Sequence, residues 1–504
     1  MTSSKRRFSV LLLLGGLAGA CEATATTPDL HSDGSDAGAA GALGPLDPGF
    51  TGTPPDVWTT SGGAAIETWL PPGVDPGAVR FDPAKIQGIA VVAQTFPMPT
   101  YALTQQYALE SAGVGASVGM FMQARIDNVT IGDVAFGASA SKSRTCLGER
   151  AFGHDVALAF WSRGANPLPG DATAVYLDHV AVVAAPDCPA SGALLGGDFE
   201  IAGSWSTDAP SEIVGAGGPG TGHAAHLVVP SKGEAHLKHV AVSFPWKTMA
   251  RPAIRLAAKG GGPPLGLRVD RLTSLDDVAP AFGWIRTTAA PATSTVCIPE
   301  WSKGFALPFS IGVSQPASGA MAEYFIDDVA FVSEPSCPES AFVLGGDFEG
   351  ATASQYWAFA DAGAQVAGQP PKQTSGIVST GDAHGGGAHA LLSVDSNCLH
   401  ARMTQEITTP VAEVARGPAV KFWYRTSGAG KVAAGVDSGQ RAESLPAAGS
   451  WTPHTFCLEP GEQNRPTAVG FGAYGAGGGC VDQPVETLAI DDVEVTTDPS
   501  CPVL

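Results

Sequence analysis

Short segments in which apolar and polar residues alternate recur along the chain. The segment 419–424 is rich in aromatic and β-branched residues, and the segment 325–331 carries a bulky residue at every second position. Such alternation is typical of half-buried β-strands, because successive side chains of a strand point to opposite faces of the sheet. Long helical patterns with capping residues are absent from the sequence. The pattern predicts an all-β chain of antiparallel sandwiches or jelly rolls.

An opening motif and a closing motif repeat in the sequence. The opening motif Leu-Gly-Gly-Asp-Phe-Glu lies at 195–200 and again at 344–349, and a degenerate copy lies at 46–50. The closing segments place Asp and Val after bulky residues and run on to a Cys-Pro pair, and they lie at 176–182, 325–331 and 489–495. Both motifs recur after about 150 residues, which is longer than a solenoid repeat and fits whole domains.

The repeats therefore predict three tandem β-sandwich domains. We draw their boundaries at 43–189, 190–338 and 339–504. The composition agrees with this, because 64 Gly and 40 Pro residues imply many turns and only 15% of the residues are charged. Both features suit short strands joined by turns better than they suit long helices.

The N-terminus is predicted to be a targeting segment outside the fold. Basic residues at 5–7 precede an apolar stretch at 8–17 that is too short to span a bilayer. The residues before Cys21 resemble the lipobox of bacterial lipoproteins, in which a cysteine receives the lipid and becomes the mature N-terminus. Ala18 stands where that family usually has Leu, and 18–20 also fits ordinary signal-peptide cleavage.

We expect residues 1–20 to be a lipoprotein-type signal peptide with Cys21 as the lipidated residue. Residues 21–42 consist largely of small and polar residues and read as a flexible tether. The chain would then be exported and held at the outer membrane or the cell surface by lipid. Secretion without an anchor is the alternative.

The nine cysteines of the chain are an odd number. Exported proteins oxidise their thiols, and if Cys21 carries lipid, an even set of eight remains. The repeated spacing predicts one disulfide in each domain, namely Cys146–Cys188, Cys297–Cys337 and Cys457–Cys501, and the last two residues give Cys398–Cys480. The alternative is that the cysteines stay reduced and serve as small hydrophobic residues.

The charge balance limits the possible partners. Acidic residues outnumber basic ones 48 to 28, which gives a net charge of −20. Phosphate backbones and anionic membrane surfaces would be repelled by such a chain. We therefore exclude nucleic acid as a partner.

No motif predicts an enzyme. The segment 115–119 fits the GxSxG pattern, but that motif needs a strand, a sharp turn and a helix, and no helical pattern follows. The adjacent acids at 327–328 and 491–492 lie on predicted strands, where neighbours face opposite ways and cannot flank one glycosidic bond. A catalytic TIM barrel would need about 250 residues, and the three domains and the tether leave no such space.

The motifs resemble those of the galactose-binding-like jelly rolls, a family that includes many carbohydrate-binding modules of bacterial glycanases. The resemblance rests on the opening Gly-Gly-Asp-Phe-Glu, the Trp that follows it, the domain length and the closing Ile-Asp-Asp-Val. It covers nearly all of 190–504 and is weaker over 43–189, where the opening motif is eroded. It implies a jelly-roll fold and a carbohydrate ligand.

The resemblance also implies a structural calcium ion where the first and last strands of a domain meet. Carried over, the ligands are Glu200 with Asp327 in the second domain and Glu349 with Asp491 in the third, and only Asp178 matches in the first. Ca²⁺ takes six to eight hard oxygen ligands, which carboxylates supply. The alternative is that these acids are solvated residues at strand ends.

Aromatic residues outside the repeated motifs are the candidate ligand contacts, because sugars stack their apolar faces on aromatic rings. These residues are Trp246, Trp284, Trp301, Trp423, Tyr424 and Trp451. Trp205 and Trp357 follow the opening motif and are expected in the core. Two functions stay open, a non-catalytic surface lipoprotein that binds an extracellular glycan, and a structural or adhesive protein that contacts another surface protein or acts as a spacer.

Overall fold

The computed structural model describes residues of one unit of the chain, Leu43–Leu504, and the other unit is Met1–Ala42. The described residues are 44–46, 49–51, 57–67, 77–82, 86, 89–115, 120–127, 129–137, 140–164, 174–201, 203–215, 217–220, 222–231, 233–269, 281–314, 320–350, 353–363, 375–396, 399–410, 412–436, 439–459, 466–474 and 482–503. The predicted signal peptide, the tether, Cys21 and the Cys398–Cys480 pair lie outside them.

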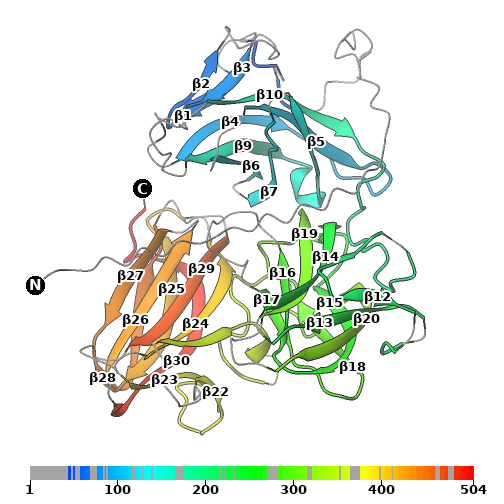
Figure 1. Ribbon diagram of the computed structural model, residues 1–504. Coiled ribbons are helices and arrows are strands. Elements are labelled where there is room, and N and C mark those ends of the chain that lie inside the picture. Colours follow the sequence, from blue (N-terminus) through cyan, green and yellow to red (C-terminus); the bar gives the residue numbers. More distant parts are fainter. Residues whose placement is uncertain are drawn as a thin grey trace, which may run out of the picture. The chain divides into compact units, whose positions relative to one another are not determined.

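The strands fall into three sets, one in each of the predicted domains (Figure 1), which we call modules 1, 2 and 3. The strands of module 1 are Thr59–Ser61 (β1), Ala64–Glu67 (β2), Ala78–Phe81 (β3), Ile89–Pro97 (β4), Tyr107–Val114 (β5), Met120–Ile126 (β6), Val129–Asp133 (β7), Ser141–Cys146 (β8), Asp155–Gly164 (β9) and Val175–Ala184 (β10). The strands of module 2 are Ser206–Thr207 (β11), Glu212–Val214 (β12), Ala224–Val229 (β13), Glu234–Ser243 (β14), Pro252–Gly261 (β15), Leu265–Val269 (β16), Ala281–Ile285 (β17), Ala292–Cys297 (β18), Ala306–Ser314 (β19) and Ala322–Ser333 (β20). The strands of module 3 are Ala358–Gly363 (β21), Gly376–Val378 (β22), His389–Ser396 (β23), Leu399–Thr408 (β24), Gly417–Thr426 (β25), Ala429–Val436 (β26), Gly439–Leu445 (β27), Ala448–Cys457 (β28), Pro466–Tyr474 (β29) and Asp482–Asp498 (β30).

Each module contains two five-stranded antiparallel sheets. The first sheets have the orders β1-β4-β9-β6-β7, β11-β14-β19-β16-β17 and β21-β24-β29-β26-β27, and the second sheets have the orders β2-β3-β10-β5-β8, β12-β13-β20-β15-β18 and β22-β23-β30-β25-β28. Besides strands, the described residues contain only two short 3₁₀ turns, Glu149–Ala151 (η1) and Ala353–Gln355 (η2). The all-β sandwich fold predicted from the sequence is confirmed.

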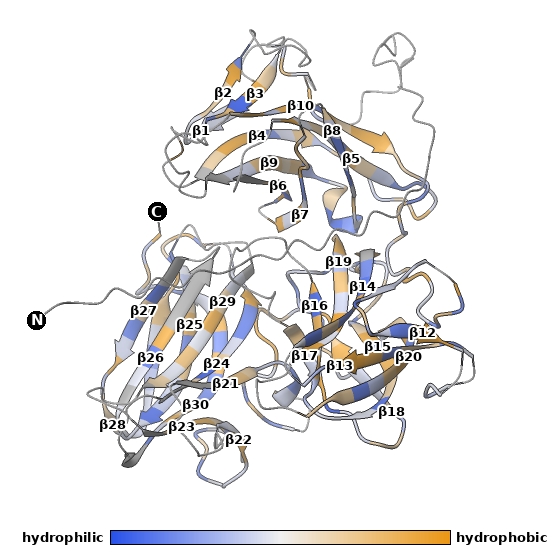
Figure 2. Ribbon diagram, in the orientation of Figure 1, coloured by the Kyte–Doolittle hydropathy of each residue, from blue (hydrophilic) through white to orange (hydrophobic). Residues whose placement is uncertain are grey.

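The alternation of residues along the strands builds the core. In module 2, Leu237 of β14, Leu267 of β16 and Ile311 of β19 are fully buried, and hydrophilic and hydrophobic residues alternate along such strands (Figure 2). Truncating a buried Leu or Ile to Ala typically costs about 2–5 kcal/mol, so these inward positions dominate the stability of the sandwich.

The opening motif is bonded to the closing strand, which explains why the two motifs occur together. The amide of Val329 donates to the carbonyl of Gly197 over 2.8 Å, and Val493 donates to Gly346 over 2.8 Å. A Cβ on Gly197 would lie 1.9 Å from the carbonyl oxygen of Val329, and one on Gly346 would lie 2.1 Å from that of Val493. Only glycine therefore permits this close approach.

The closing strand of every module carries a bulge at its Asp. The residue after this Asp has a positive φ, of 53° at His179, 52° at Asp328 and 48° at Asp492, and the strand register shifts there. In all three modules the Oδ1 atom of the preceding Asp accepts the amide of that residue, over 2.6 to 2.9 Å. His, Asp and Asn tolerate this left-handed conformation better than most residues, which accounts for the Asp-Asp of the motif.

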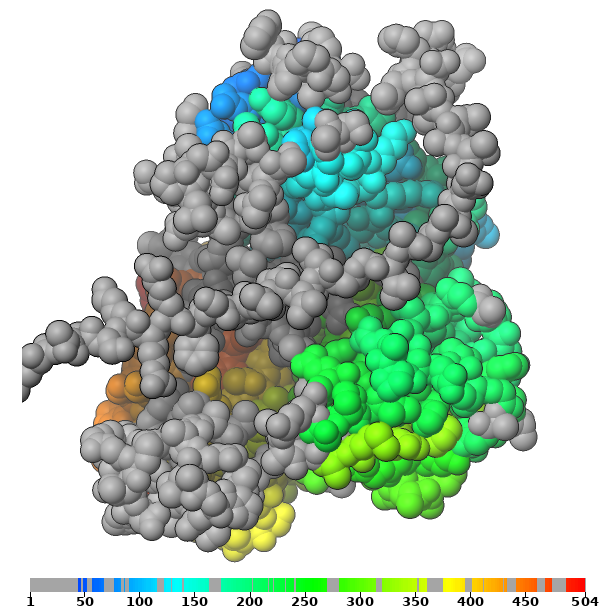
Figure 3. Space-filling view, in the orientation of Figure 1, coloured from blue at the N-terminus to red at the C-terminus, as the bar shows by residue number. Residues whose placement is uncertain are grey.

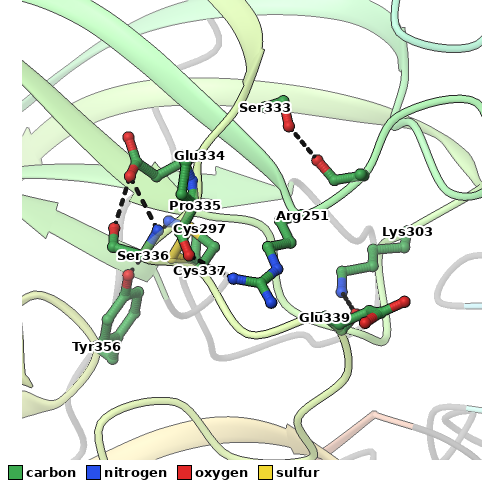
Figure 4. Close-up of a disulfide and its surroundings, with 11 residues drawn as sticks. Arg251, Cys297, Lys303, Ser333, Glu334, Pro335, Ser336, Cys337, Glu339 and Tyr356 are labelled. Carbon is green, nitrogen blue, oxygen red and sulfur yellow. Dashed lines mark hydrogen bonds between the residues drawn. A yellow bond between two sulfur atoms is a disulfide. The ribbon is translucent and has the colours of Figure 1, made fainter.

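Three of the predicted disulfides are confirmed, Cys146–Cys188, Cys297–Cys337 and Cys457–Cys501. Figure 4 shows the pair in module 2, with Tyr356 accepting the amide of Cys297 over 3.2 Å and Lys303 donating to the carbonyl of Glu339 over 3.0 Å. Each bridge closes a loop of about 40 residues, and chain entropy alone predicts about 4 kcal/mol of stabilisation for a loop of that length.

Candidate functional site

One row of residues crosses the first sheet of module 2 on its outer side. His236 of β14 pairs with Gly312 of β19, Gly312 pairs with Gly266 of β16, and Gly266 pairs with Trp284 of β17. Their chain neighbours point into the core, so these four residues point away from it. We call His236, Gly266, Arg268, Trp284 and Gly312 the Trp284 face.

The two glycines of the Trp284 face make room for the flanking rings. A Cβ on Gly312 would lie 2.2 Å from Cδ2 of His236, and a Cβ on Gly266 would lie 3.2 Å from Cζ3 of Trp284. Glycine inside a strand weakens the strand, and it often marks a place where another group approaches the backbone closely. Here the missing side chains let the imidazole and the indole lie low against the sheet.

A chain of polar groups lies beside the indole. Arg268 is only 4% exposed, and its Nη1 lies 3.1 Å from Nε2 of His236. Because arginine can only donate, His236 accepts at Nε2 and donates from Nδ1 to Asp208, over 3.3 Å. Lys238 donates to the other oxygen of Asp208 over 3.1 Å. The network fixes the orientation of the imidazole and of the guanidinium next to Trp284.

Figure 3 shows the described residues of module 2, in green, on one side of the molecule. Trp284 is half-buried, so part of its ring is accessible. A partly exposed indole beside fixed donors and acceptors suits a ligand that is flat on one side and hydroxylated at its edge.

Module 1 repeats the arginine at the same place in its first sheet. The β6–β7 register shifts between Ala124 and Arg125 as the β16–β17 register shifts between Leu267 and Arg268. Arg125 is also 4% exposed, and its guanidinium lies 4.0 Å from the ring centre of Trp161. A cation–π contact of this kind contributes roughly 1–2 kcal/mol when it is shielded from water.

The position of Trp284 is taken by an acid in module 1. Asp133 pairs with Gln123 as Trp284 pairs with Gly266. Burial raises the pKa of Asp133 to about 7, because the ionised carboxylate is poorly solvated there. The first sheets of modules 1 and 2 thus share the arginine and differ in the group across from it.

Two of the predicted ligand contacts are wrong. Trp301 and Tyr424 are each 2% exposed, so neither can meet a ligand. Tyr424 follows Trp423 on β25, and the pleat turns it into the core while Trp423 faces outward. Trp205 and Trp357 are buried as expected, and each indole donates to a carbonyl of the opening motif, that of Gly196 or Gly345.

The remaining predicted contacts lie at two other places. Trp246 is half-buried between Arg150 and Lys247. Trp423 and Trp451 lie on the outer side of the second sheet of module 3, where the imidazole of His384 stacks on Trp423 with ring centres 3.7 Å apart. The structure therefore does not bring the predicted aromatic residues together into one binding surface.

Sequence reasoning missed the arginines of the first sheets. A signal existed, because Arg125-Ile126-Asp127 and Arg268-Val269-Asp270 are related tripeptides in the middle of two repeats. The ligand contacts were predicted among aromatic residues, and arginine is not aromatic. His236 and Asp208 carried no such signal, because only strand pairing brings them next to Arg268.

The acids predicted to bind calcium converge on one glycine-rich loop in module 2 and on one in module 3. Glu200 accepts the amide of His223 over 2.6 Å, and Asp327 accepts that of Gly220 over 3.2 Å. In module 3, Glu349 accepts the amides of Gly387 and Ala388, and Asp491 accepts those of His384 and Gly385. Asp178 of module 1 accepts the amide of His179. Burial raises the pKa of Asp327 and of Asp491.

These pairs supply hard oxygen atoms, but amide donors already occupy them. The described part of the chain contains no group of three or more His, Cys, Asp or Glu side chains that could hold a metal ion. A calcium ion would need its remaining ligands from backbone carbonyls or water. Calcium therefore stays a prediction.

No protein-family model matches the chain, and no curated protein matches it. Among solved structures, the chain is similar to TmCBM61 in complex with β-1,4-galactotriose, with 14% identity and a TM-score of 0.21 over 28% of this chain and 88% of that chain. It is also similar to the N-terminal CBM22-1-CBM22-2 tandem domain of Paenibacillus barcinonensis Xyn10C, with 13% identity and a TM-score of 0.22 over 59% of this chain and 100% of that one.

A further similar structure is the enzymatically active domain of the bacteriophage CBA120 tailspike protein 4. The identity is 16% and the TM-score 0.23, over 31% of this chain and 21% of that chain. Likeness at such identities concerns the fold alone.

Proposed function

We propose that the chain is a non-catalytic protein that binds carbohydrate, and that the Trp284 face of module 2 is a binding site. The observation that carries the proposal is the position of Trp284 over a glycine, with a fixed guanidinium and imidazole beside it. A pyranose ring would stack its apolar C–H face on the indole, and its hydroxyl groups would bond to the accessible Asp208 and Lys238. The buried Arg268 would not contact the sugar but would hold His236 in place.

The entropy cost of binding favours this site over an isolated surface tryptophan. The bonds of His236 to Arg268 and to Asp208 hold both polar groups before any ligand arrives. Binding then costs little side-chain entropy, and preorganised groups gain affinity for that reason.

The same proposal covers the location of the chain. We infer an exported protein anchored through lipid on Cys21, because the segment before Cys21 resembles a lipobox and three disulfides need an oxidising compartment. Within the described ranges, no helix has the length and apolar character needed to cross a bilayer. A Cys21→Ser variant is expected to leave the membrane fraction, and equal retention of that variant would contradict the anchor.

The binding proposal is tested by replacing the indole. In the mature full-length protein, Trp284→Ala should weaken binding to its best neutral oligosaccharide on a glycan array by about tenfold, the equivalent of about 1.4 kcal/mol of lost stacking. Trp284→Phe should keep part of the affinity because it keeps a ring.

Trp451→Ala serves as the matched control, since it removes a half-buried Trp from a different sheet and module. Its binding should equal that of the wild type. If Trp284→Ala binds as the wild type does while Trp451→Ala loses the ligand, the Trp284 face is not the site.

A further inference from the structure

A second candidate site lies between a loop of module 1 and a loop of module 2. A cavity of about 500 Å³ is lined there by Asp127, Arg150, Phe152, Gly153, His154, Ala157, Trp246 and Lys247. It lies away from the Trp284 face and shares no residue with it. Three of its residues carry basic side chains, which is unusual in a chain with a net charge of −20.

Glu149 holds the two loops together. It is 5% exposed, and its carboxylate accepts hydrogen bonds from the amides of Trp246 and Lys247, over 3.1 and 3.0 Å. The hydroxyls of Ser191 and Thr248 donate to it as well, over 2.9 and 3.0 Å. Four donors satisfy this buried carboxylate, so the walls of the cavity are fixed, and Glu149 forms its hydrogen bonds with these donors and not with the guanidinium of Arg150.

Arg150 forms no ion pair among the described residues, because the two acids that act on its charge, Asp127 and Glu300, are paired with His154 and Lys303. Its Nη1 donates only to the carbonyl of Glu300, over 3.3 Å, and the carboxylate of Glu300 is bonded to Lys303 instead. The guanidinium lies 5.3 Å from the ring centre of Trp246. Burial lowers the pKa of Arg150. A half-buried charge without a counter-ion is costly, and an anion in the cavity would relieve that cost.

Lys247 adds a second free cation on the same indole. Its Nζ lies 4.3 Å from the ring centre of Trp246, and within the described part of the chain it meets no carboxylate. His154 and Asp127 pair with each other over 2.8 Å, so Asp127 is not available to Lys247. Arg150 and Lys247 place two positive charges beside an aromatic ring.

We propose that this cavity binds the carboxylate of an acidic sugar, a uronate, between Arg150 and Lys247, the two cations that lie over the ring of Trp246. The inference rests on the proposed carbohydrate binding and adds a charged ligand class to it. Planar guanidinium matches carboxylate geometry, and a lysine ammonium adds a second positive charge to it. A neutral oligosaccharide would leave both cations unpaired and should not be held here.

The test compares trigalacturonate with neutral galactotriose by calorimetry on the mature full-length protein. Lys247→Met keeps the apolar stem and removes the charge, and it should weaken trigalacturonate binding about tenfold. Arg150→Met should weaken it more, with the melting temperature measured to show that the variant is folded. Lys142→Met removes an exposed lysine of module 1 outside the cavity and should have no effect.

The outcomes separate this inference from the proposed function. Binding of galactotriose should survive Lys247→Met and fall with Trp284→Ala, whereas binding of trigalacturonate should do the reverse. Trigalacturonate binding that neither Lys247→Met nor Arg150→Met alters would overturn the site. A sulfated oligosaccharide that binds through the same two residues, while trigalacturonate does not bind, would overturn the assignment to uronate.

Discussion

Modules 2 and 3 share a backbone but use the second sheet differently. Ala257 of β15 and Trp423 of β25 occupy the same place, just after the register shift and opposite the Asp of the closing strand. In module 2 this place borders a cavity of about 630 Å³ that is also lined by Arg255, Thr293 and Asp328. In module 3 the indole of Trp423 occupies the place and is covered by His384.

The difference teaches that a repeated fold does not imply a repeated site. The opening motif and the bulge are backbone features, and they recur because glycine and a left-handed residue are needed at those positions. The outer side of the second sheet has no such backbone requirement. The residue at the position of Ala257 or Trp423 decides whether a cavity or an indole lies there.

Among the substitutions, the largest loss of stability is expected from replacing Trp423 on the outer side of module 3. Trp423→Ala removes the ring on which His384 stacks and should destabilise the chain by about 2 kcal/mol, because the loop over it loses its support. Denaturant unfolding followed by the signal of module 3 would measure this. A change below about 0.5 kcal/mol would mean that the stack is a loose surface contact.

Substitutions of Asp327 and Asp491 test whether modules 2 and 3 bind calcium. Burial raises the pKa of both acids, so without metal the folded state loses stability as the pH rises through the raised pKa. In EDTA, the melting temperature of Asp491→Asn should therefore rise relative to the wild type as the pH rises above about 4, the ordinary pKa of Asp. The melting temperature of Asp327→Asn should change in the same direction.

If the predicted calcium sites exist, added calcium should raise the stability of the wild type more than that of Asp491→Asn. The wild type should then gain about 2–3 kcal/mol at a calcium concentration of about 100 times Kd, and Asp491→Asn should gain less. A melting curve of the wild type that is identical in calcium and in EDTA contradicts the calcium prediction and leaves the acids as anchors of the two loops.

The smallest change in the free energy of unfolding is expected from filling the cavity beside Ala257 in module 2. Ala257→Trp places an indole next to the cavity of module 2, where space exists, so the free energy of unfolding should change by less than about 1 kcal/mol. Thr293→Trp on the neighbouring strand is the companion variant. A loss of several kcal/mol on either change would show that the two faces differ in backbone and not only in side chains.

The sequence by itself determined the fold class and the disulfides. Alternation and turn composition report directly on strands, because the side-chain period of a strand is two. The repeated spacing of the cysteines paired Cys146 with Cys188 and its counterparts, and the structure confirms all three bridges. The family resemblance implied that the first and last strands of a domain meet, and the structure joins the opening motif to the closing strand by hydrogen bonds.

Only the tertiary structure decided which side chains meet. Trp301 and Trp284 looked alike in the sequence, yet packing buries the first and leaves the second on the outer side of a sheet. His236 reaches Arg268 through strands that are paired across the sheet, and the loop with Trp246 reaches Arg150 through the buried Glu149. Local patterns fix the face on which a residue lies, but they carry no information on the neighbour across it, because register and packing between distant segments set that contact.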